Sequence, residues 1–494
     1  NTIWHVRAKP KRGVINFIRT RLFSFVILLA ALFSLSSANT KSIYYSFDTT
    51  GPLSIKAKDH KGKSVISSSG VIVLMTGLHN DYYLVDSSNK IGHLYVEVKL
   101  EKFLNDQAKR IPLNISIVID RSGSMEGIKM GYAKKAAKGI IDQLKPEDIV
   151  SIVIYDNYVD TLQSPINVIH KDKIKAKIDR ITPRGGTNLW GGTEQGYAYV
   201  KQNYHPGFIN RVLLISDGLA NVGLTDSTLI RIKVQKFNDD EGISLSTFGV
   251  GLDYNETLMT DMAETGAGNY YFIDAADKLA VVFDKELNGL LNIAAQNAEL
   301  KIKLPSGVKI QKGYPLKFHQ IADTITVRLR DLSSQETKAS LFTFSIDNNL
   351  GTTLKFSSAI TYTDVVDGRP KFLVNENILS PVRIVDAYLT HYNKQVIEQA
   401  ILFNVNEKLE TAMNLMEKGD YNGAKKYISE NAAYLKAHST YVDGYNDLIK
   451  MDSLNTNYQA MYYSASSISA DSVKRIQKVN KAENYRLRNK KQLP

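Results

Sequence analysis

The sequence predicts an α/β protein in which a doubly wound, mostly parallel sheet is inserted between two β-rich segments and is followed by a helical region. Apolar and polar residues alternate over residues 39–110 and again over 296–376, which is the period of half-buried strands. Over 111–295, continuous apolar strands alternate with amphipathic helical stretches, as in a parallel sheet covered by helices on both faces. Over 377–472 the pattern is helical.

Composition restricts the class of protein. The chain has 494 residues, of which 43% are apolar and 23% charged, as in globular proteins of about three domains. The absence of cysteine from the sequence excludes disulfide frameworks, cysteine proteases and iron–sulfur sites. The net charge of +12 comes from the two ends, since residues 1–38 hold six basic residues and 473–494 hold eight. The body between them is nearly neutral, so composition gives no support for nucleic-acid binding.

The N-terminal segment has the features of a signal peptide. Residues 22–35 form an apolar run that follows basic residues and precedes the small residues Ser36, Ser37 and Ala38. The run is shorter than the about 20 residues that a membrane span needs. We therefore expect residues 1–38 to be removed. The mature protein would be exported to the periplasm, the cell surface or the exterior, without a transmembrane span. The alternatives are a buried helix or an uncleaved anchor.

The two β-rich segments, 39–110 and 296–376, are each small for an independent hydrophobic core. We expect them to be the first and second halves of one β-sandwich, with residues 111–295 inserted between them as a separate domain. The alternative is that each segment forms a small β module of its own.

The helical region, 377–472, contains a turn at residues 418–420. Residues around this turn resemble a tetratricopeptide hairpin, namely Ala412, Leu415, Gly419, Tyr421 and Ala424. A period of 34 residues does not recur, so an ordinary helical hairpin is favoured over a peptide-binding array. The basic residues 473–494 are expected to form a mobile, solvated tail, with contact to anionic lipid or an acidic cell surface as the alternative.

The α/β region has a regular order of expected elements. The strands are 113–119, 149–155, 211–216, 243–250 and 269–273, and the helices lie near 126–144, 190–204, 226–238, 255–264 and 276–295. In a Rossmann-like sheet of this kind, ligands bind outside the carboxyl ends of the strands, where the strand order reverses. Functional residues are therefore expected in the loops at those strand ends.

Five side chains with oxygen ligands lie in loops that can reach this crevice. Asp120, Ser122 and Ser124 follow the first strand of the region. Thr187 lies in the loop RGGTNLWGG, and Asp217 comes directly after the strand RVLLIS. Oxygen ligands that include two carboxylates suit a hard divalent cation such as Mg²⁺, Mn²⁺ or Ca²⁺. A cation would also relieve the repulsion between two carboxylates held close together.

In this order, Asp120, Ser122, Ser124, Thr187 and Asp217 resemble the metal-ion-dependent adhesion site of the von Willebrand factor A domain family. The resemblance covers residues 111–295. It implies that the two serines and the threonine contact a divalent metal, with Mg²⁺ expected and Mn²⁺ or Ca²⁺ as alternatives. The two aspartates would bind it directly or through water. A Glu or Asp of a protein partner would complete the coordination.

Other residues near these loops have two interpretations each. Met125, Asn188 and Trp190 are candidates for the rim that contacts the partner, although Trp190 also fits a core position at the start of a helix. Asp156 follows the second strand and is either a support for the metal ligands or a solvated turn residue. Asn221 is expected to shape the loop beside Asp217.

The predicted function is that of a metal-dependent adhesion or assembly module, without enzymatic activity. One alternative is an envelope scaffold in which the metal site is structural or vestigial. The other is a metal-assisted hydrolase, but beyond the expected ligands the three loops offer only Glu126 and Asp156 as acid–base groups. The last helix of the α/β region, 276–295, leads into the second β-rich segment and is expected to relay the state of the metal site.

Overall fold

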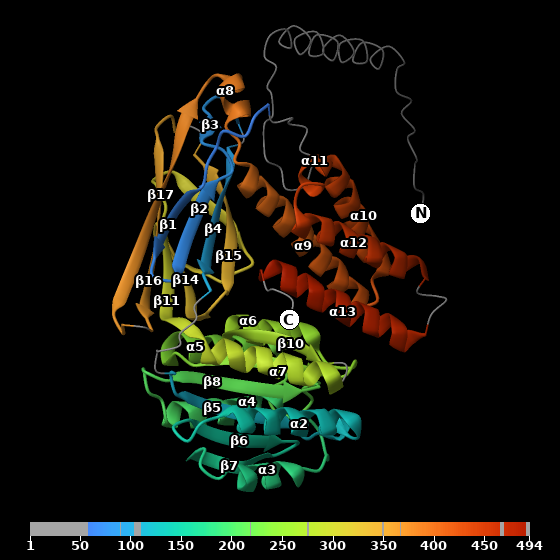
Figure 1. Cartoon of the computed structure of the whole chain (residues 1–494). Helices are drawn as coiled ribbons and strands as arrows, with labels where there is room; N and C mark the ends of the chain where they lie inside the picture. Colours follow the sequence, from blue (N-terminus) through green and yellow to red (C-terminus); the bar gives the residue numbers. More distant parts are fainter. Residues whose placement is uncertain are drawn as a thin grey trace, which may run out of the picture. The chain divides into compact units, whose positions relative to one another are not determined.

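The computed structural model describes residues 58–490, except 89, 103–109, 218, 274–275, 348–349, 366 and 465–468. The signal peptide predicted over 1–38 lies outside the described residues. Within the described part of the chain, no helix combines the length and the apolar character that crossing a membrane requires. Figure 1 shows the elements in chain order, coloured from blue to red.

The α/β domain contains a six-stranded sheet in the order β10-β9-β8-β5-β6-β7. The strands are β5 (Leu113–Asp120), β6 (Ile149–Tyr155), β7 (Val159–Asn167), β8 (Ile209–Ser216), β9 (Ser244–Val250) and β10 (Ala267–Ile273). All neighbours are parallel except β6 and β7, which form an antiparallel edge pair. Strand β5 lies between β6 and β8, so the strand order reverses at its carboxyl end. The predicted doubly wound α/β fold is confirmed.

Helices cover both faces of this sheet, and as a result every residue of β5 and β8 is buried. The helices are α2 (Ile128–Gln143), α3 (Lys171–Asp179), α4 (Leu189–Gln202), α5 (Ser227–Glu241), α6 (Glu256–Thr265) and α7 (Ala276–Leu291). Alternate residues of β5 pack in different hydrophobic cores, one on each face of the sheet. Ile117 packs in the cluster that includes α2 and α7, whereas Val118 packs in the cluster that includes α4, α5 and α6.

The two β-rich segments contribute strands to the same two sheets. One sheet has the order β1-β2-β4-β15-β12 and the other β13-β14-β11-β16-β17-β3. The strands from the first segment are β1 (Val65–Ser69), β2 (Ile72–Leu78), β3 (Tyr82–Leu84) and β4 (Ile91–Leu100). Those from the second are β11 (Ile293–Lys303), β12 (Val308–Tyr314), β13 (His319–Ile321), β14 (Thr324–Ser333), β15 (Thr337–Ile346), β16 (Leu354–Asp364) and β17 (Pro370–Val382).

A single hydrophobic cluster joins the two segments. It includes Leu94 and Val96 of β4 together with Phe342 and Phe344 of β15, and β4 pairs antiparallel with β15. Strand β17 continues to Val382, past the boundary expected at 376, because burial keeps alternating along it, through Leu373, Asn375, Asn377 and Leu379.

The helical region contains α8 (Val385–Thr390), α9 (Lys394–Glu417), α10 (Tyr421–Ala437), α11 (Ser439–Val442), α12 (Asn446–Ser464) and α13 (Ala470–Arg488). Helices α9 and α10 form the hairpin expected around residues 418–420, where Gly419 has a φ of 81°. Asp420 caps α10 by accepting a hydrogen bond from the Gly423 N–H at 2.9 Å.

The prediction of a mobile tail over 473–494 is wrong for its described part, because residues 470–488 form helix α13. Lys478 and Arg488 are buried rather than solvated. Their charges are paired with acidic residues far away in the sequence, so the basic composition of the segment gave no sign of its docking. Ser469 starts the helix by capping the Ser472 N–H.

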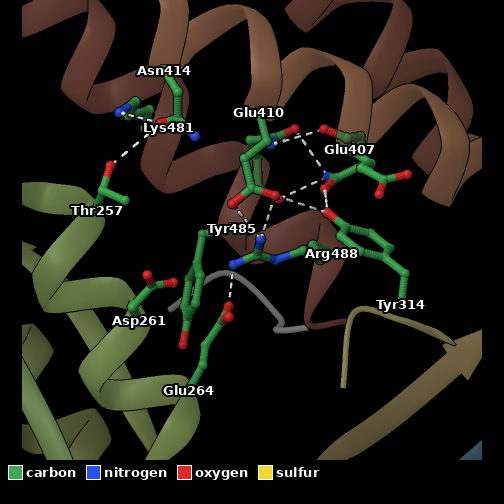
Figure 2. Close-up of polar contacts among 12 residues, drawn as sticks. Thr257, Asp261, Glu264, Tyr314, Glu407, Glu410, Asn414, Lys481, Tyr485 and Arg488 are labelled. Carbon is green, nitrogen blue, oxygen red and sulfur yellow. Dashed lines mark hydrogen bonds and ion pairs between the residues drawn. The ribbon is translucent and has the colours of Figure 1, made fainter. Parts of the chain in front are cut away.

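We define the α13 seam as the contact of α13 with the α/β domain and helix α9, made by Glu256, Glu264, Glu410, Lys478 and Arg488. Figure 2 shows Arg488 between Glu264 of α6 and Glu410 of α9. The Arg488 guanidinium lies 2.7 Å from both carboxylate oxygens of Glu410. Lys478 lies 3.4 Å from Glu256. The seam thus pairs buried or part-buried acids with buried bases across three elements of the chain.

The edge of the α/β sheet also contributes to this docking. The backbone N–H of Tyr270, on edge strand β10, donates to the Tyr485 hydroxyl of α13 at 3.2 Å. Burial raises the pKa of Glu264, and the charge of Arg488 opposes that rise. Helix α13 therefore covers part of a sheet edge as well as neutralising acids.

Candidate metal centre

The first strand end holds Asp120 in a fixed orientation. Its Oδ1 accepts a hydrogen bond from the Ser122 N–H at 2.8 Å, and its Oδ2 accepts one from the Ser216 hydroxyl at 2.6 Å. The carboxyl group has no exposed surface. Because Ser216 is the last residue of β8, the two neighbouring strand ends β5 and β8 are joined at the switch point.

The serines of the Asp-x-Ser-x-Ser loop connect Asp120 to Asp217. The Ser122 and Ser124 hydroxyl oxygens are 3.0 Å apart, and the Ser124 hydroxyl donates to Asp217 Oδ1 at 2.9 Å. A short 3₁₀ turn, η1 (Gly123–Met125), curls the loop so that both serines are on the same side. Four of the five predicted ligands are thus brought together by hydrogen bonds.

Thr187, the fifth predicted ligand, lies in a loop that backbone hydrogen bonds hold between the other two. The Gly123 N–H donates to the Gly185 carbonyl at 3.0 Å, and the Asn221 N–H donates to the Thr187 carbonyl at 3.1 Å. In return, the Thr187 N–H donates to the Asn221 side chain at 2.8 Å. Asn221 therefore shapes the loop as expected, and the buried Thr187 is placed between the first and third loops.

The site concentrates negative charge at a buried point. Burial raises the pKa of Asp120 to about 6, against the hydrogen bonds from Ser216 and Ser122, and the charge of Asp217 adds to the rise. The Lys129 ammonium lies 3.0 Å from Asp217 Oδ2. These residues fit a hard divalent cation, since the donors are oxygen only and a positively charged group already stands against one of the two carboxylates.

Asp156 is an anchor for two arginines rather than a solvated turn residue. It is buried, and its Oδ2 accepts hydrogen bonds from Arg121 at 2.8 Å and Arg184 at 2.7 Å. Burial opposes ionisation of this carboxyl group, but the hydrogen bonds from Arg184 and the Tyr158 N–H hold its pKa below the usual value. Because Arg121 and Arg184 flank the first and second loops, this cluster fixes the loops to each other. The sequence analysis missed both arginines.

The predicted partner-binding rim needs correction. Met125 is fully buried in the core beneath the first loop, and Trp190 is only 4% exposed. Trp190 instead packs near Phe237 of α5, which is the core position considered as its alternative. Asn188 caps α4 by accepting from the Gly191 N–H at 3.1 Å. Met125 is buried by the curvature of its turn and Trp190 by the packing of α4, and a linear pattern reveals neither.

Other apolar side chains are exposed near these loops, at the start of α2, in the β6–β7 turn and beyond Asp217. Ile128 follows the first loop and is 70% exposed, Tyr158 follows Asp156 and is 73% exposed, and Leu219 follows Asp217 and is 46% exposed. Their only sequence signal is their position next to the ligand loops. They are candidates for the surface around the metal site.

The last helix of the domain is tied to the sheet by a buried ion pair. Glu286 of α7 lies 3.0 Å from Arg211 of β8 and accepts a hydrogen bond from the Ser246 hydroxyl at 2.5 Å. Helix α7 ends at Leu291, and β11 of the sandwich begins at Ile293. The relay expected through 276–295 has this physical connection and stays a prediction.

Comparison with known proteins identifies the domain. The family described as von Willebrand factor type A domain matches residues 114–285. The uncharacterized protein YfbK of Escherichia coli is 34% identical over 192 residues, which cover 38% of this chain and 33% of YfbK. The uncharacterized protein sll0103 of Synechocystis is 23% identical and is covered over 80% of its length, with 66% of this chain. Inter-alpha-trypsin inhibitor heavy chain H2 of Mesocricetus auratus is 31% identical over 38% of this chain and 21% of its own.

Two solved structures extend the likeness of fold beyond that domain. The von Willebrand factor type A protein from Catenulispora acidiphila aligns with a TM-score of 0.62 over 78% of this chain and 91% of its own, at 16% identity. The ArnB paralog VWA2 from Sulfolobus acidocaldarius aligns with a TM-score of 0.56 over 84% and 98%, at 16% identity. The chain spans about a third of the length of YfbK. From the family match and the sheet topology together, residues 114–285 form a von Willebrand factor type A domain.

Proposed function

We propose that the protein is an exported, metal-dependent adhesion or assembly module. Ser122, Ser124 and Thr187 hold a divalent cation, Mg²⁺ first and Mn²⁺ or Ca²⁺ as alternatives, and Asp120 and Asp217 neutralise it directly or through water. The bound cation supplies a positive charge with one open coordination position. An Asp or Glu side chain of a protein partner takes that position.

The hydrogen-bonded series from Asp120 through Ser122 and Ser124 to Asp217 carries this proposal. It gathers oxygen donors from the ends of two adjacent strands at the point where ligands bind in open α/β sheets. The family supports a role in protein interaction, because von Willebrand factor type A domains bind protein ligands. The identity of the partner and its carboxylate are part of the proposal.

A binding role fits the loops better than catalysis does. Metal-assisted hydrolysis needs a general base beside the metal. Asp156 is occupied by two arginines, which leaves exposed Glu126, at the C-terminal end of η1, as the one acidic group of the first loop outside the candidate ligands. We therefore propose that the site binds without turnover.

The first experiment measures metal binding by the full chain. Mg²⁺, Mn²⁺ and Ca²⁺ are titrated by calorimetry, and thermal unfolding is followed with EDTA or excess ion. An ion at about 100 times its Kd is expected to stabilise the α/β domain by about 2.7 kcal/mol. Ser124→Ala should lose this effect, whereas Ser164→Ala, at an exposed position on β7, should keep it. Equal stabilisation of both variants contradicts the proposed site.

The second experiment tests the open coordination position. Water bound to Mn²⁺ in the loaded protein enhances the relaxation rate of solvent protons, and a carboxylate that displaces this water lowers the enhancement. Glutarate is the probe, and neutral glutaramide is the control. A decrease with glutarate alone supports recognition of a partner carboxylate. No decrease with either probe, together with metal stabilisation, favours the alternative of a structural metal in an envelope scaffold.

A further inference from the structure

We propose that Lys129 is a tethered cation that competes with the divalent metal for Asp217 and so sets the metal affinity of the site, with Asp253 as its alternative carboxylate. This inference rests on the proposed metal-binding function. It adds an affinity-determining residue that is not one of the five ligands.

Lys129 contacts the carboxylate oxygen of Asp217 that does not bond to Ser124. Ser124 donates to Oδ1 of Asp217 at 2.9 Å, and the Lys129 ammonium lies 3.0 Å from Oδ2. The Asp217 side chain is 1% exposed and that of Lys129 is 20% exposed. The pair is thus largely withdrawn from solvent, where ion pairs are screened less than at the surface.

The place of Lys129 in its helix is unfavourable without a nearby acid. It is the second residue of α2, whose first turn contains no acidic residue. The N-terminal end of a helix carries partial positive charge and stabilises anions rather than cations. Asp217 offsets this cost, so the position of Lys129 indicates that the metal-free site needs a positive charge of its own.

Two cations at Asp217 would repel each other. A divalent ion coordinated by Ser124 and Asp217 would lie within a few ångströms of the ammonium, and the low solvent exposure of the pair weakens screening. Metal binding therefore requires Lys129 to withdraw. The free energy of breaking the Lys129–Asp217 pair is subtracted from the metal affinity.

The structure offers Lys129 a second carboxylate. Its side chain passes over Gly251, since a Cβ there would lie 2.6 Å from Lys129 Cε. Asp253 is two residues further along and lies 2.7 Å from Lys474 of α13. The hydrogen bond from Lys474 lowers the pKa of Asp253, and the charge of Lys129 contributes to that lowering. In this proposal, Asp253 receives Lys129 when the metal occupies the site.

The test compares metal affinities of full-chain variants by calorimetry at constant ionic strength. Lys129→Met keeps the length of the side chain and removes its charge, so Mg²⁺ and Mn²⁺ should bind roughly tenfold more tightly. Lys129→Arg keeps the charge and should bind metal no more tightly than wild type. The matched control is Lys138→Met on the same helix, where the ammonium pairs with Asp179 at 2.7 Å. Its metal affinity should stay within about twofold of wild type.

Two further variants give effects of opposite sign. Asp253→Asn removes the alternative carboxylate and should weaken metal binding by roughly threefold. Lys474→Met removes the other partner of Asp253, which leaves this carboxylate to Lys129, and should strengthen metal binding slightly. Both substitutions lie outside the ligand set, and a change in affinity reports on Lys129 if it disappears when the same substitution is combined with Lys129→Met.

The outcomes separate this inference from the proposed function. If wild type binds metal and Lys129→Met binds it equally or more weakly, the competition is refuted and the metal site stands. If neither protein binds any of the three ions, the proposed metal site itself fails and the inference falls with it. If only Lys129→Met binds metal, Lys129 excludes the ion from the native site, which supports the competition and argues against metal-dependent function in the wild type.

Discussion

Carboxylates are buried both in the loops that carry the candidate metal ligands and in the α13 seam. The groups that neutralise these carboxylates differ between the two regions. In the seam, Glu264 and Glu256 pair with Arg488 and Lys478 of the same helix. In the loops, Asp120 is held by hydroxyl and backbone groups, and Asp217 is held by Ser124 and a single ammonium. A seam whose acids already face bases is suited to holding elements together. A group of loops whose acids face mainly hydroxyl groups is suited to receiving a cation.

The largest expected effect breaks the seam. Arg488→Met removes one buried base from between Glu264 and Glu410, so one nearly buried carboxylate and one that is 36% exposed lose their shared partner. Loss of one partner from a buried ion pair costs about 3–5 kcal/mol. Chemical denaturation should show a loss of this size, and hydrogen exchange should rise in α13 and β10. Arg475→Met, at an exposed position of the same helix, is the control and should change stability little. Equal stability of the two variants would mean that the seam does not hold the domains.

The next effect is the contribution of Asp156 to the stability of the metal-free protein. Asp156→Asn removes the charge that holds Arg121 and Arg184, and we expect a loss of about 3 kcal/mol in EDTA. The control is Asp160→Asn, because Asp160 contacts the same two arginines but is 49% exposed. Its loss should be below about 1 kcal/mol. Similar losses for both variants would show that burial of Asp156 is not what fixes the loops.

A smaller effect concerns His79, a buried side chain that stays neutral, in contrast to the paired charges above. Burial lowers the pKa of His79, in the loop after β2, to about 4. Since this value is below that of the unfolded chain, the contribution to stability is complete above about pH 6.5 and is lost as the pH falls toward 4. By pH 5 the loss is about 2 kcal/mol. His79→Gln should reduce this dependence in denaturation curves between pH 7 and 5, whereas exposed His205→Gln should not. An unchanged pH profile of His79→Gln would assign the effect to other groups.

The sequence predicted the α/β fold and the proximity of the candidate ligand side chains because both depend on short-range patterns. Continuous apolar strands occupy the centre of the sheet, and Asp120, Ser122 and Ser124 are close together along the chain. Placement of Asp217 followed from the rule that parallel strands end at one edge of the sheet. The rim was predicted poorly, because burial of Met125 depends on how a single 3₁₀ turn curves over the core.

The sequence by itself determined the type of elements and the chemistry of the candidate site, since periodicity and side-chain oxygens are properties of the chain. Only the tertiary structure decided which charges face each other. Lys129 meets Asp217, and Arg488 meets Glu264, across separations of 88 and 224 residues. Coulomb interactions depend on distance in space and on burial, and neither is visible in a linear order of residues. For that reason a basic segment expected as a solvated tail became a docked helix, and a lysine of α2 came to lie against Asp217 of the candidate metal centre.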